Sequence, residues 1–517
     1  MSARTLSDIK LSIDKDETEL VKIATKKLGK PPAYFAIKKK SLDARDKTAI
    51  KYIYTIEFSD KERPVTAEFV ERLPKNKLPE NPVLVVGSGP AGLFCALRLI
   101  ERGITPIVIE RGAPVEEREK DTQAFFDGKG LHTQSNVQFG EGGAGTFSDG
   151  KLNTQTHDPR NNKVLQTFVR FGAPQEIAWL NKPHIGSDNL KKVVKAMREY
   201  ILAQGGQVLF HTRLDDIKIE NGVLTGATLV NAKTGETQTV AVSALALAIG
   251  HSARDTFERL LSRGVQMRAK DFAVGVRIEH LQAKIGFAQY GNAYTKLPAA
   301  DYKLVYRGDK RSAFTFCMCP GGFVMPATSE EYGVVTNGMS NYARDGKNAN
   351  AALIAQVTTS DFGDGAMDGV ELQRKIERAA YIAGGENYSA PVQLVGDFLR
   401  DRVSDKFGEV TPTYAAGTAF ADLRAVLPAY IAETLKSAIT EMDKRLKGFA
   451  CPDAVLTGAE TRTSSPVRIE RDNESLQSVN TANLYPCGEG AGYAGGITSS
   501  AADGIRVADA IFKKYMQ

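Results

Sequence analysis

Three glycines with the spacing G-x-G-x-x-G follow an apolar run, and this arrangement is suited to hold a diphosphate. The run is 83–86 (VLVV), and the glycines are Gly87, Gly89 and Gly92. Gly87 permits a tight turn, Gly89 lets the backbone approach a pyrophosphate, and Gly92 lets a helix pack closely on the sheet. The N-terminus of that helix presents free N–H groups and the positive end of its dipole to the phosphates. The spacing therefore predicts a dinucleotide site.

An acidic residue stands where such a site needs one. Residues 93–102 carry the apolar stripe of a helix, and 105–109 (TPIVI) predict a second strand that ends at Glu110. Glu110 can accept hydrogen bonds from both ribose hydroxyls, and its charge would repel a 2′-phosphate. The cofactor-binding residues predicted in this region are Gly87, Ser88, Gly89, Pro90, Ala91, Gly92, Glu110 and Arg111.

A glycine-dense loop begins 30 residues after that acid. Five of the eleven residues 140–150 (GEGGAGTFSDG) are glycine, which excludes a stable helix or strand. The loop is either a flexible surface segment or a second wall of the cofactor site in which Lys151 faces a developing anion. We favour the second wall because the loop follows the ribose acid so closely. Its predicted contacts are Gly142, Gly143, Ala144, Gly145, Thr146 and Lys151.

Length and composition limit the possible classes of protein. A chain of 517 residues is too long for one core and predicts two or three domains, and 42% hydrophobic with 25% charged residues is typical of a soluble globular protein. No apolar run approaches the ~20 residues that cross a bilayer, and the N-terminus lacks a signal peptide. Five scattered cysteines favour a reducing cytoplasm over a disulfide scaffold. We therefore expect a cytoplasmic protein without membrane partners.

The order of patterns predicts four segments. Residues 1–75 contain a strand, a helix and two strands, which indicates a small α+β domain before a Pro-rich linker. Their basic run 38–45 is either a solvated loop, which we favour, or an anion or RNA contact. The net charge of +6 is too small to imply nucleic acid by itself. The expected boundaries of the four segments are 1–75, 76–268, 269–450 and 451–517.

Further elements follow from periodicity. A helix is predicted over 188–203, an antiparallel meander over 214–242 and a buried parallel strand from 244 to Gly250. Residues 270–400 read as a mixed sheet, and helices are expected over 348–385, 420–447 and 498–514. Because no second G-x-G-x-x-G follows a mid-chain strand, a separate NAD(P)H domain is not expected.

These motifs together resemble the glutathione-reductase-type superfamily of FAD proteins with two dinucleotide motifs. More narrowly, the chain is similar to the uncharacterised FAD-dependent dehydrogenases of bacteria. That resemblance rests on Lys39–Arg45 (KKSLDAR), Phe139–Leu152, Ala248–Asp255 (AIGHSARD), the turn C-M-C-P-G-G and Gly488–Ile497 (GEGAGYAGGI). It implies an α/β fold: a Rossmann-like FAD-binding domain split around a mixed-sheet substrate domain, with the small N-terminal α+β domain.

The resemblance also implies which further residues contact FAD. The meander would lie over the adenine, with Leu214 contributing its backbone, and the Gly488–Glu489 pair would stand where the family has Gly-Asp on the ribityl chain. The last helix would point its dipole at the pyrimidine end of the flavin, where it stabilises a reduced, anionic ring. The implied contacts are Leu214, Gly250, His251, Gly488, Glu489, Gly495, Gly496 and Ile497.

The expected function is an FAD-dependent oxidoreductase that moves a hydride or an electron pair between flavin and a small organic substrate, with NAD(P)H as a transient donor. The alternatives are an FAD-dependent tRNA-modifying enzyme and a non-catalytic flavin electron carrier; nucleic acid is not an expected partner, and the sequence does not fix the oligomeric state. No metal site is expected. Lys151 is the first candidate for electrostatic catalysis. Cys317 and Cys319 occupy alternate positions on a predicted strand. They are either a redox or nucleophilic pair of thiols or two small core residues, and we favour the core interpretation. Further candidates near the ring are His251, Arg254, in a local pair with Asp255, and Arg468.

Overall fold

The dinucleotide motif forms the centre of a five-stranded parallel sheet in the computed structural model, which describes residues 3–62, 70–154 and 156–517. The order is β22-β10-β4-β5-β6. The strands are β4 (Val83–Val86), β5 (Pro106–Ile109), β6 (Gln207–Leu209), β10 (Ala244–Leu247) and β22 (Leu484–Pro486). The chain passes from β4 outward to β5 and β6 and returns on the other side of β4. The topological switch point therefore lies between β4 and β10, where open α/β sheets bind their ligands.

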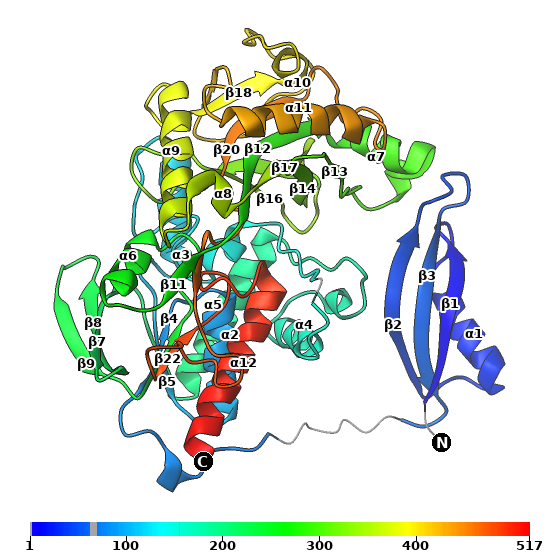
Figure 1. Cartoon of the computed structure of the whole chain (residues 1–517). Helices are drawn as coiled ribbons and strands as arrows, with labels where there is room; N and C mark the ends of the chain where they lie inside the picture. Colours follow the sequence, from blue (N-terminus) through cyan, green and yellow to red (C-terminus); the bar gives the residue numbers. More distant parts are fainter. Residues whose placement is uncertain (1–2, 63–69, 155) are drawn as a thin grey trace.

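Helices and a meander cover the two faces of this sheet. Alternate residues of β4 pack into different cores: Val83 and Val85 face the helices, and Leu84 and Val86 face the meander. The first face carries α2 (Pro90–Glu101), α3 (Val115–Phe126), α4 (Arg160–Arg170), α5 (Ser187–Ala203) and α12 (Ile497–Met516). The second carries β7 (Thr212–Glu220), β8 (Val223–Asn231), β9 (Thr237–Ala241) and α6 (Arg254–Ser262). The predicted meander and last helix are thus confirmed (Figure 1).

A second, larger sheet has seven strands in the order β13-β14-β17-β12-β20-β18-β19. Its strands are β12 (Phe272–Leu281), β13 (Val305–Arg307), β14 (Ser312–Cys319), β17 (Asn348–Val357), β18 (Ala390–Leu394), β19 (Thr418–Phe420) and β20 (Val455–Glu460). All neighbours are antiparallel except β18 and β19. The helices α9 (Asp368–Ala383) and α11 (Ala429–Asp443) lie beside it (Figure 1).

One predicted helix is wrong at its start. Residues 348–357 form the long strand β17, which pairs along its length with β12. Its alanine-rich sequence (NANAALIAQV) favours a helix locally, but the segment is buried between two neighbouring strands and the tertiary pairing decides. The helical part of this region consists of the short α8 (Thr359–Phe362) and of α9, which begins at Asp368.

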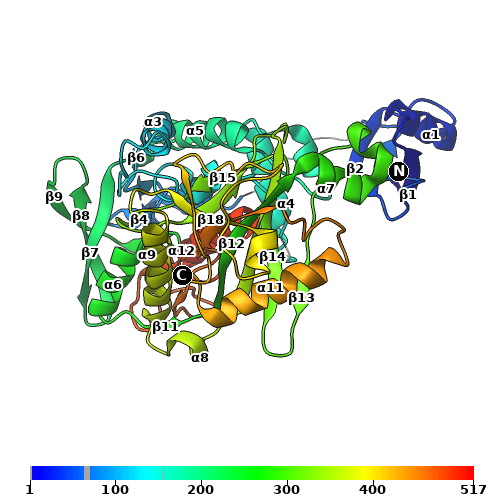
Figure 2. The same ribbon diagram turned by 90° about the horizontal axis from the view of Figure 1, so that it is seen from above.

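The N-terminal unit is a three-stranded antiparallel sheet in the order β1-β3-β2 with one helix on it. Its elements are β1 (Arg4–Ser12), α1 (Thr18–Leu28), β2 (Tyr34–Asp43) and β3 (Lys51–Ser59). It lies at the opposite end of the molecule from the meander (Figure 2). Most of the basic run predicted as a loop belongs to β2, where Lys40 pairs with Glu17 at 2.6 Å. The backbone of Lys40 also exchanges hydrogen bonds with Trp179 and Asn181 of the main body, both at 2.9 Å.

Short elements complete the chain. They are α7 (Gln282–Tyr290), α8 (Thr359–Phe362), α10 (Val395–Phe398), β11 (Met267–Ala269), β15 (Phe323–Pro326), β16 (Thr336–Met339) and β21 (Val467–Ile469). Strands β11 and β21 pair with each other, and so do β15 and β16. No helix among the described residues has the length and apolar character to cross a bilayer.

Candidate functional site

A cavity of about 330 Å³ opens at the carboxyl edge of the parallel sheet, at the switch point. Its size falls within the usual range for ligand sites. Four loops that follow parallel strands meet there with the glycine-rich loop and with the edge of the large sheet. The predicted residues that line it are Gly87, Gly89, Pro90, Ala91, Glu110, Arg111, Gly143, Ala144, Gly145, Lys151, Leu214, Gly250, His251, Cys317, Glu489, Gly495, Gly496 and Ile497.

Six predicted residues lie behind the wall rather than on it. Ser88 and Gly488 support the wall through hydrogen bonds. The Ser88 N–H donates to Glu110, and the Gly488 N–H donates to Asp503. The Thr146 hydroxyl donates to the Glu141 carbonyl. The six residues are Ser88, Gly92, Gly142, Thr146, Cys319 and Gly488. The structure therefore brings the remote segments together but gives these positions supporting roles.

Each glycine of the motif has its own steric reason. A Cβ on Gly87, whose φ is 100°, would lie 2.4 Å from the Ala248 carbonyl oxygen. One on Gly92 would lie 1.8 Å from the Gly87 oxygen, so the helix can approach the turn only with glycine there. A Cβ on Gly89 would meet nothing nearer than 3.8 Å, because this residue faces the cavity.

Glu110 is buried and already surrounded by donors. Its Oε2 accepts from the Ser88 N–H and hydroxyl, both at 2.9 Å, and its Oε1 accepts from the N–H groups of Gly112 and Gly140, both at 3.0 Å. A carboxylate offers about four acceptor positions, so these bonds occupy them. Only the Ser88 hydroxyl can rotate away and free a position for a ribose hydroxyl.

Arg111 closes one end of the cavity through a pair that the sequence did not predict. Its guanidinium donates to both oxygens of Asp255, at 2.9 and 3.1 Å, and lies over the Phe139 ring. The expected local pair of Arg254 with Asp255 is wrong. Arg254 instead donates to both carboxylate oxygens of Glu377, at 2.7 and 2.9 Å.

Arg254 belongs to a buried charge cluster that joins α6 to α9. Glu377 accepts from Arg254 and from Arg462, and neither Arg254 nor Arg468 lines the cavity. Burial alone would raise the pKa of Glu377, but the two guanidinium groups outweigh it and hold that pKa well below its usual range. The cluster fixes the nucleotide-binding half against the large sheet.

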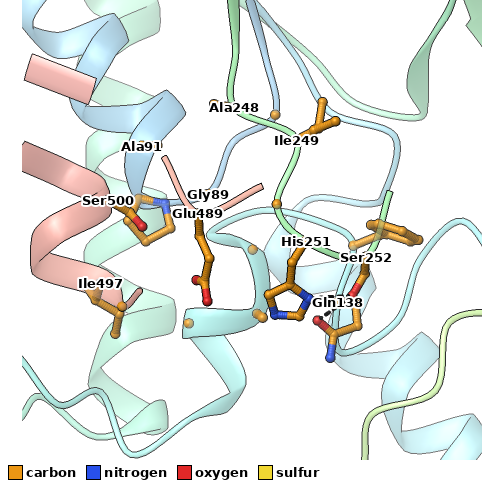
Figure 3. A pocket seen from close by; sticks show the side chains of 18 of the residues that line it. Gly89, Ala91, Gln138, Ala248, Ile249, His251, Ser252, Glu489, Ile497 and Ser500 are labelled. Atoms are coloured by element: carbon orange, nitrogen blue, oxygen red, sulfur yellow. Dashed lines mark hydrogen bonds between the residues drawn. The ribbon is translucent and has the colours of Figure 1, made fainter. Parts of the chain in front are cut away.

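His251 presents an unprotonated nitrogen to the cavity. The Ser252 hydroxyl donates to Gln138 Oε1 at 3.2 Å, so its one hydrogen is committed, and His251 Nδ1, at 3.1 Å, must donate to Ser252 (Figure 3). Burial, with Arg462 and Arg254 nearby, lowers the pKa of His251 to about 3. The ring is therefore neutral, and Nε2, which no described residue contacts by a hydrogen bond, can accept one.

Glu489 points into the same space from the loop after β22 (Figure 3). Its carboxyl group has no hydrogen-bond partner among the described residues. Burial raises the pKa of Glu489 to about 7, although Lys270 nearby opposes the shift. A carboxyl group held in this state can donate or accept a hydrogen bond at neutral pH.

Lys151 contributes a cation to the glycine-rich wall. No described residue makes a hydrogen bond or an ion pair with its ammonium group. The neighbouring Asp149 is instead engaged by Arg344 at 2.9 Å. The positive charge of Lys151 therefore remains available to a bound molecule.

The cavity fits a dinucleotide by its own geometry. Gly250, Gly495 and Gly496 line it, and a Cβ on any of them would meet no atom within 4 Å. A backbone cradle of this kind admits a large ligand at close range. The N-terminus of α12 opens into the same space and offers its positive dipole end to anionic groups.

Family models match three parts of the chain. Residues 80–133 match an FAD binding domain, residues 271–463 match the C-terminal domain-like part of an FAD-dependent protein, and residues 4–59 match a domain of unknown function (DUF8436). A protein of Clostridium beijerinckii, named "Uncharacterized protein", is 48% identical over 533 residues, which cover 99% of this chain and 98% of the relative.

The chain belongs to the same family as this relative, a family of FAD-dependent proteins. Its cofactor is FAD, and the residues of this flavoprotein that line the cavity at the switch point, among them the glycine turn, Leu214 and the start of α12, would hold it.

Solved structures of flavoproteins are similar to this FAD-dependent protein at low identity. The flavin-dependent halogenase CmlS is 12% identical with a TM-score of 0.39, covering 85% of this chain and 59% of that one. A geranylgeranyl bacteriochlorophyll reductase-like protein of Thermoplasma acidophilum is 12% identical with a TM-score of 0.37, covering 84% and 78%. These likenesses are too weak to carry a conclusion about this flavoprotein.

The wall that this FAD-dependent protein builds from its large sheet contains residues that sequence reasoning missed. Arg277 is fully buried and donates to both oxygens of Glu460, at 2.8 and 2.9 Å. It also donates to Asn337 at 2.8 Å and to the Cys317 carbonyl at 2.9 Å, and all three partners line the cavity. No sequence signal links these positions, because Arg277 and Glu460 lie 183 residues apart.

Proposed function

We propose that this flavoprotein is an oxidoreductase that moves a hydride or an electron pair between FAD and an organic substrate. Bound FAD supplies the two-electron chemistry, and the protein supplies position and charge. The observation that carries the proposal is that Lys151, whose ammonium group has no partner among the described residues, lines the same cavity as the backbone cradle and the N-terminus of α12.

Lys151 and the helix dipole both favour negative charge in the cavity. A two-electron reduction of a flavin without full protonation leaves a negative charge, which these groups would stabilise. His251 contributes differently, because its neutral Nε2 accepts a hydrogen bond from a hydroxyl or N–H group. The chain thus supports the reduced cofactor through charge and holds it through neutral contacts.

The direct test is anaerobic reduction of the yellow protein by NADH and by NADPH, followed by a search for organic oxidants that restore the oxidised spectrum. Bleaching with reoxidation by an organic compound supports an oxidoreductase. A flavin that no donor reduces, or that only oxygen reoxidises, contradicts it.

Removing the charge tests the role of Lys151. Lys151→Met should lower the two-electron midpoint potential of the flavin by on the order of 30–60 mV, from the Coulomb energy of a unit charge at an effective dielectric constant near 20. The potential is measured by equilibration with reference dyes. Lys182→Met, which removes an exposed lysine paired with Asp301 outside the cavity, should leave the potential unchanged. A shift equal in both variants would contradict the assigned role.

A further inference from the structure

Asn337 is a polar side chain on the cavity wall whose orientation is fixed by its neighbours. It belongs to β16, and its Oδ1 accepts two hydrogen bonds, from Arg277 at 2.8 Å and from the N–H group of Gly338 at 2.7 Å. An amide oxygen has two acceptor positions, and both are filled here. Because a guanidinium and a backbone N–H can only donate, the atom that faces them must be the oxygen, and the amide cannot be turned round.

The nitrogen of the same amide remains for a ligand. Asn337 Nδ2 carries two N–H groups, and neither makes a hydrogen bond within the part of the chain that the structure describes. The side chain is partly exposed and lines the cavity, whereas its oxygen is held by the buried Arg277. Asn337 therefore offers a bound molecule two donors and no acceptor.

Arg277 can hold this amide in place because none of its own donors is spare. It donates to both oxygens of Glu460, at 2.8 and 2.9 Å. It also donates to the Cys317 carbonyl at 2.9 Å and to Asn350 Oδ1 at 3.1 Å. With the bond to Asn337, these contacts use all five N–H groups of the guanidinium. Arg277 is thus a positioning residue that acts through Asn337.

The end of β14 is irregular beside this guanidinium. The pairing of β14 with β17 shifts register between Phe316 and Cys319 and skips Cys317, whose φ of 41° lies in the left-handed region. A non-glycine residue adopts this conformation where its surroundings hold it. The Cys317 carbonyl accepts from Arg277. The predicted alternation of the two cysteines ends at this point, with Cys317 on the cavity and Cys319 buried.

The surroundings of Asn337 favour a neutral oxygen acceptor. Behind the wall the charge of Glu460 is matched by Arg277, and Phe316, which is 38% exposed, adds an apolar flank to the cavity. Glu489 faces the same space, and burial raises its pKa to about 7. A carboxylate ligand would meet this second carboxylate as the pH rises above 7. A carbonyl oxygen has no such conflict and accepts hydrogen bonds from N–H groups.

We propose that Asn337, positioned by Arg277, binds the carbonyl oxygen of the organic substrate, and that the substrate is therefore a carbonyl compound. The proposal rests on the oxidoreductase function above and names its substrate class. It concerns a hydrogen bond in the complex, so binding tests it without turnover.

Two neutral probes of nearly the same outline test this subsite in the oxidised holoprotein. Cyclohexanone presents only an acceptor, whereas cyclohexanol can also donate. Asn337→Asp keeps the oxygen that Arg277 needs but replaces the two N–H donors with an acceptor. Its dissociation constant for cyclohexanone should rise about 10-fold, and that for cyclohexanol should change by less than about 3-fold, because the alcohol can donate to the new oxygen. Both constants are measured from the change in flavin absorbance during titration at pH 6.

Asn153→Asp is the matched control. Asn153 is an exposed residue on the same lining, so this variant adds the same charge to the cavity. It should leave the ratio of the two constants within about 2-fold of the native value. A native protein that does not bind cyclohexanone, or a ratio that Asn337→Asp leaves unchanged or that both variants change equally, overturns the proposal.

The role of Arg277 is tested through Asn337. Arg277→Lys keeps a positive charge beside Glu460 but cannot hold the amide in the same fork, so cyclohexanone binding should weaken by about 3- to 10-fold. In an Asn337→Ala background the same change should cost nothing further. Equal losses in both backgrounds would mean that Arg277 acts on the structure alone and would overturn its positioning role.

The cofactor itself is the other group that the amide could bind. If Asn337→Ala weakens FAD binding and leaves cyclohexanone binding to the FAD-saturated protein unchanged, the amide serves the cofactor and the proposal is overturned. If Asn337→Asp does not fold, weaker cyclohexanone binding in Asn337→Ala than in Asn153→Ala supports the subsite, and equal binding overturns it.

The two proposals fail in different ways. A flavin that bleaches and is reoxidised by an organic compound, in a protein whose probe ratio does not respond to Asn337→Asp, supports the oxidoreductase and overturns the subsite. A ratio that responds as expected, in a protein whose flavin no donor reduces, supports a carbonyl-binding subsite and overturns the oxidoreductase.

Discussion

The two walls of the FAD cavity differ in which part of the chain lines them, backbone in one and side chains in the other. The wall from the parallel sheet is mainly backbone, in which Gly87, Gly89 and Gly250 present peptide groups at turns. The wall from the large sheet is made of side chains, with Cys317 and Glu460 in front and the buried Arg277 behind them. A backbone wall can hold a cofactor that many proteins share, whereas a side-chain wall can set the chemistry of one protein.

The difference has an energetic consequence. A substitution in the backbone wall acts sterically, because an added Cβ either clashes with the protein or occupies the place of the ligand. A substitution in the side-chain wall acts electrostatically, because removing one charged partner leaves the other buried and unpaired. Substitutions in the two walls should therefore have distinguishable effects on stability and on FAD affinity.

The largest effect is expected in the side-chain wall. Arg277→Met should lower the free energy of unfolding by about 3–5 kcal/mol, because Glu460 would remain buried without its partner. The Arg277 and Glu460 side chains are 0% and 5% exposed. Urea unfolding of the holoprotein measures the change.

Two variants sharpen that result. Arg277→Met combined with Glu460→Leu should recover a large part of the loss, because no uncompensated charge remains. Arg263→Met, which removes a 49% exposed partner of Asp216, should change stability by less than about 1 kcal/mol. If Arg277→Met were as mild as Arg263→Met, the distinction between the walls would not hold.

The next effect concerns the backbone wall. Gly89 has a φ of −70°, which valine adopts without strain, but a valine side chain there would occupy the cavity. Gly89→Val should weaken FAD binding by on the order of 100-fold, about 2.7 kcal/mol, and leave the FAD-free protein nearly as stable as before. Binding is measured by the change in flavin fluorescence.

Gly92→Ala is the matched comparison on the same turn. Its Cβ would lie 1.8 Å from the Gly87 oxygen, inside the protein rather than in the cavity. It should therefore destabilise the FAD-free protein itself, as measured by thermal unfolding. Equal losses of stability in the two glycine variants would contradict the assignment of Gly89 to the cavity face.

The smallest effect is a dependence of FAD affinity on pH. Burial already raises the pKa of Glu489 to about 7, and FAD would exclude more water and add negative phosphate charge, both of which raise it further. Binding therefore takes up a proton, and the affinity should fall several-fold as pH rises from 6 through 8. Glu489→Gln should flatten this profile when dissociation constants are measured across that range. A profile identical in both proteins would contradict it.

The sequence predicts the backbone wall well because its signals are local. The strand before Gly87, the helix after it and the strand ending at Glu110 each lie within about 30 residues and follow from periodicity and turn chemistry. The cofactor follows from the same stretch. The full set of hydrogen bonds to the Glu110 carboxylate could not be predicted, because the N–H group of Gly140 is brought to it only by the fold.

The side-chain wall could not be predicted for the complementary reason. Arg277 sits in an apolar strand, where a charged residue would ordinarily face solvent, and only its pairing with Glu460 makes burial tolerable. The register shift of β14 between Phe316 and Cys319 likewise has no signal in a strand-like sequence. The alanines of β17 favour a helix until neighbouring strands enclose them. Each of these features is decided by residues far away along the chain.

The late position of β22 in the chain matters for folding during synthesis. This strand pairs with β10 beside the glycine turn, yet nearly 400 residues separate it from β4. At about 5–20 residues per second, a ribosome needs roughly 20–80 s to translate that interval. The nascent chain must keep an unfinished sheet edge from aggregating throughout, and the lining of the cavity is complete only after β22 and the start of α12 have emerged.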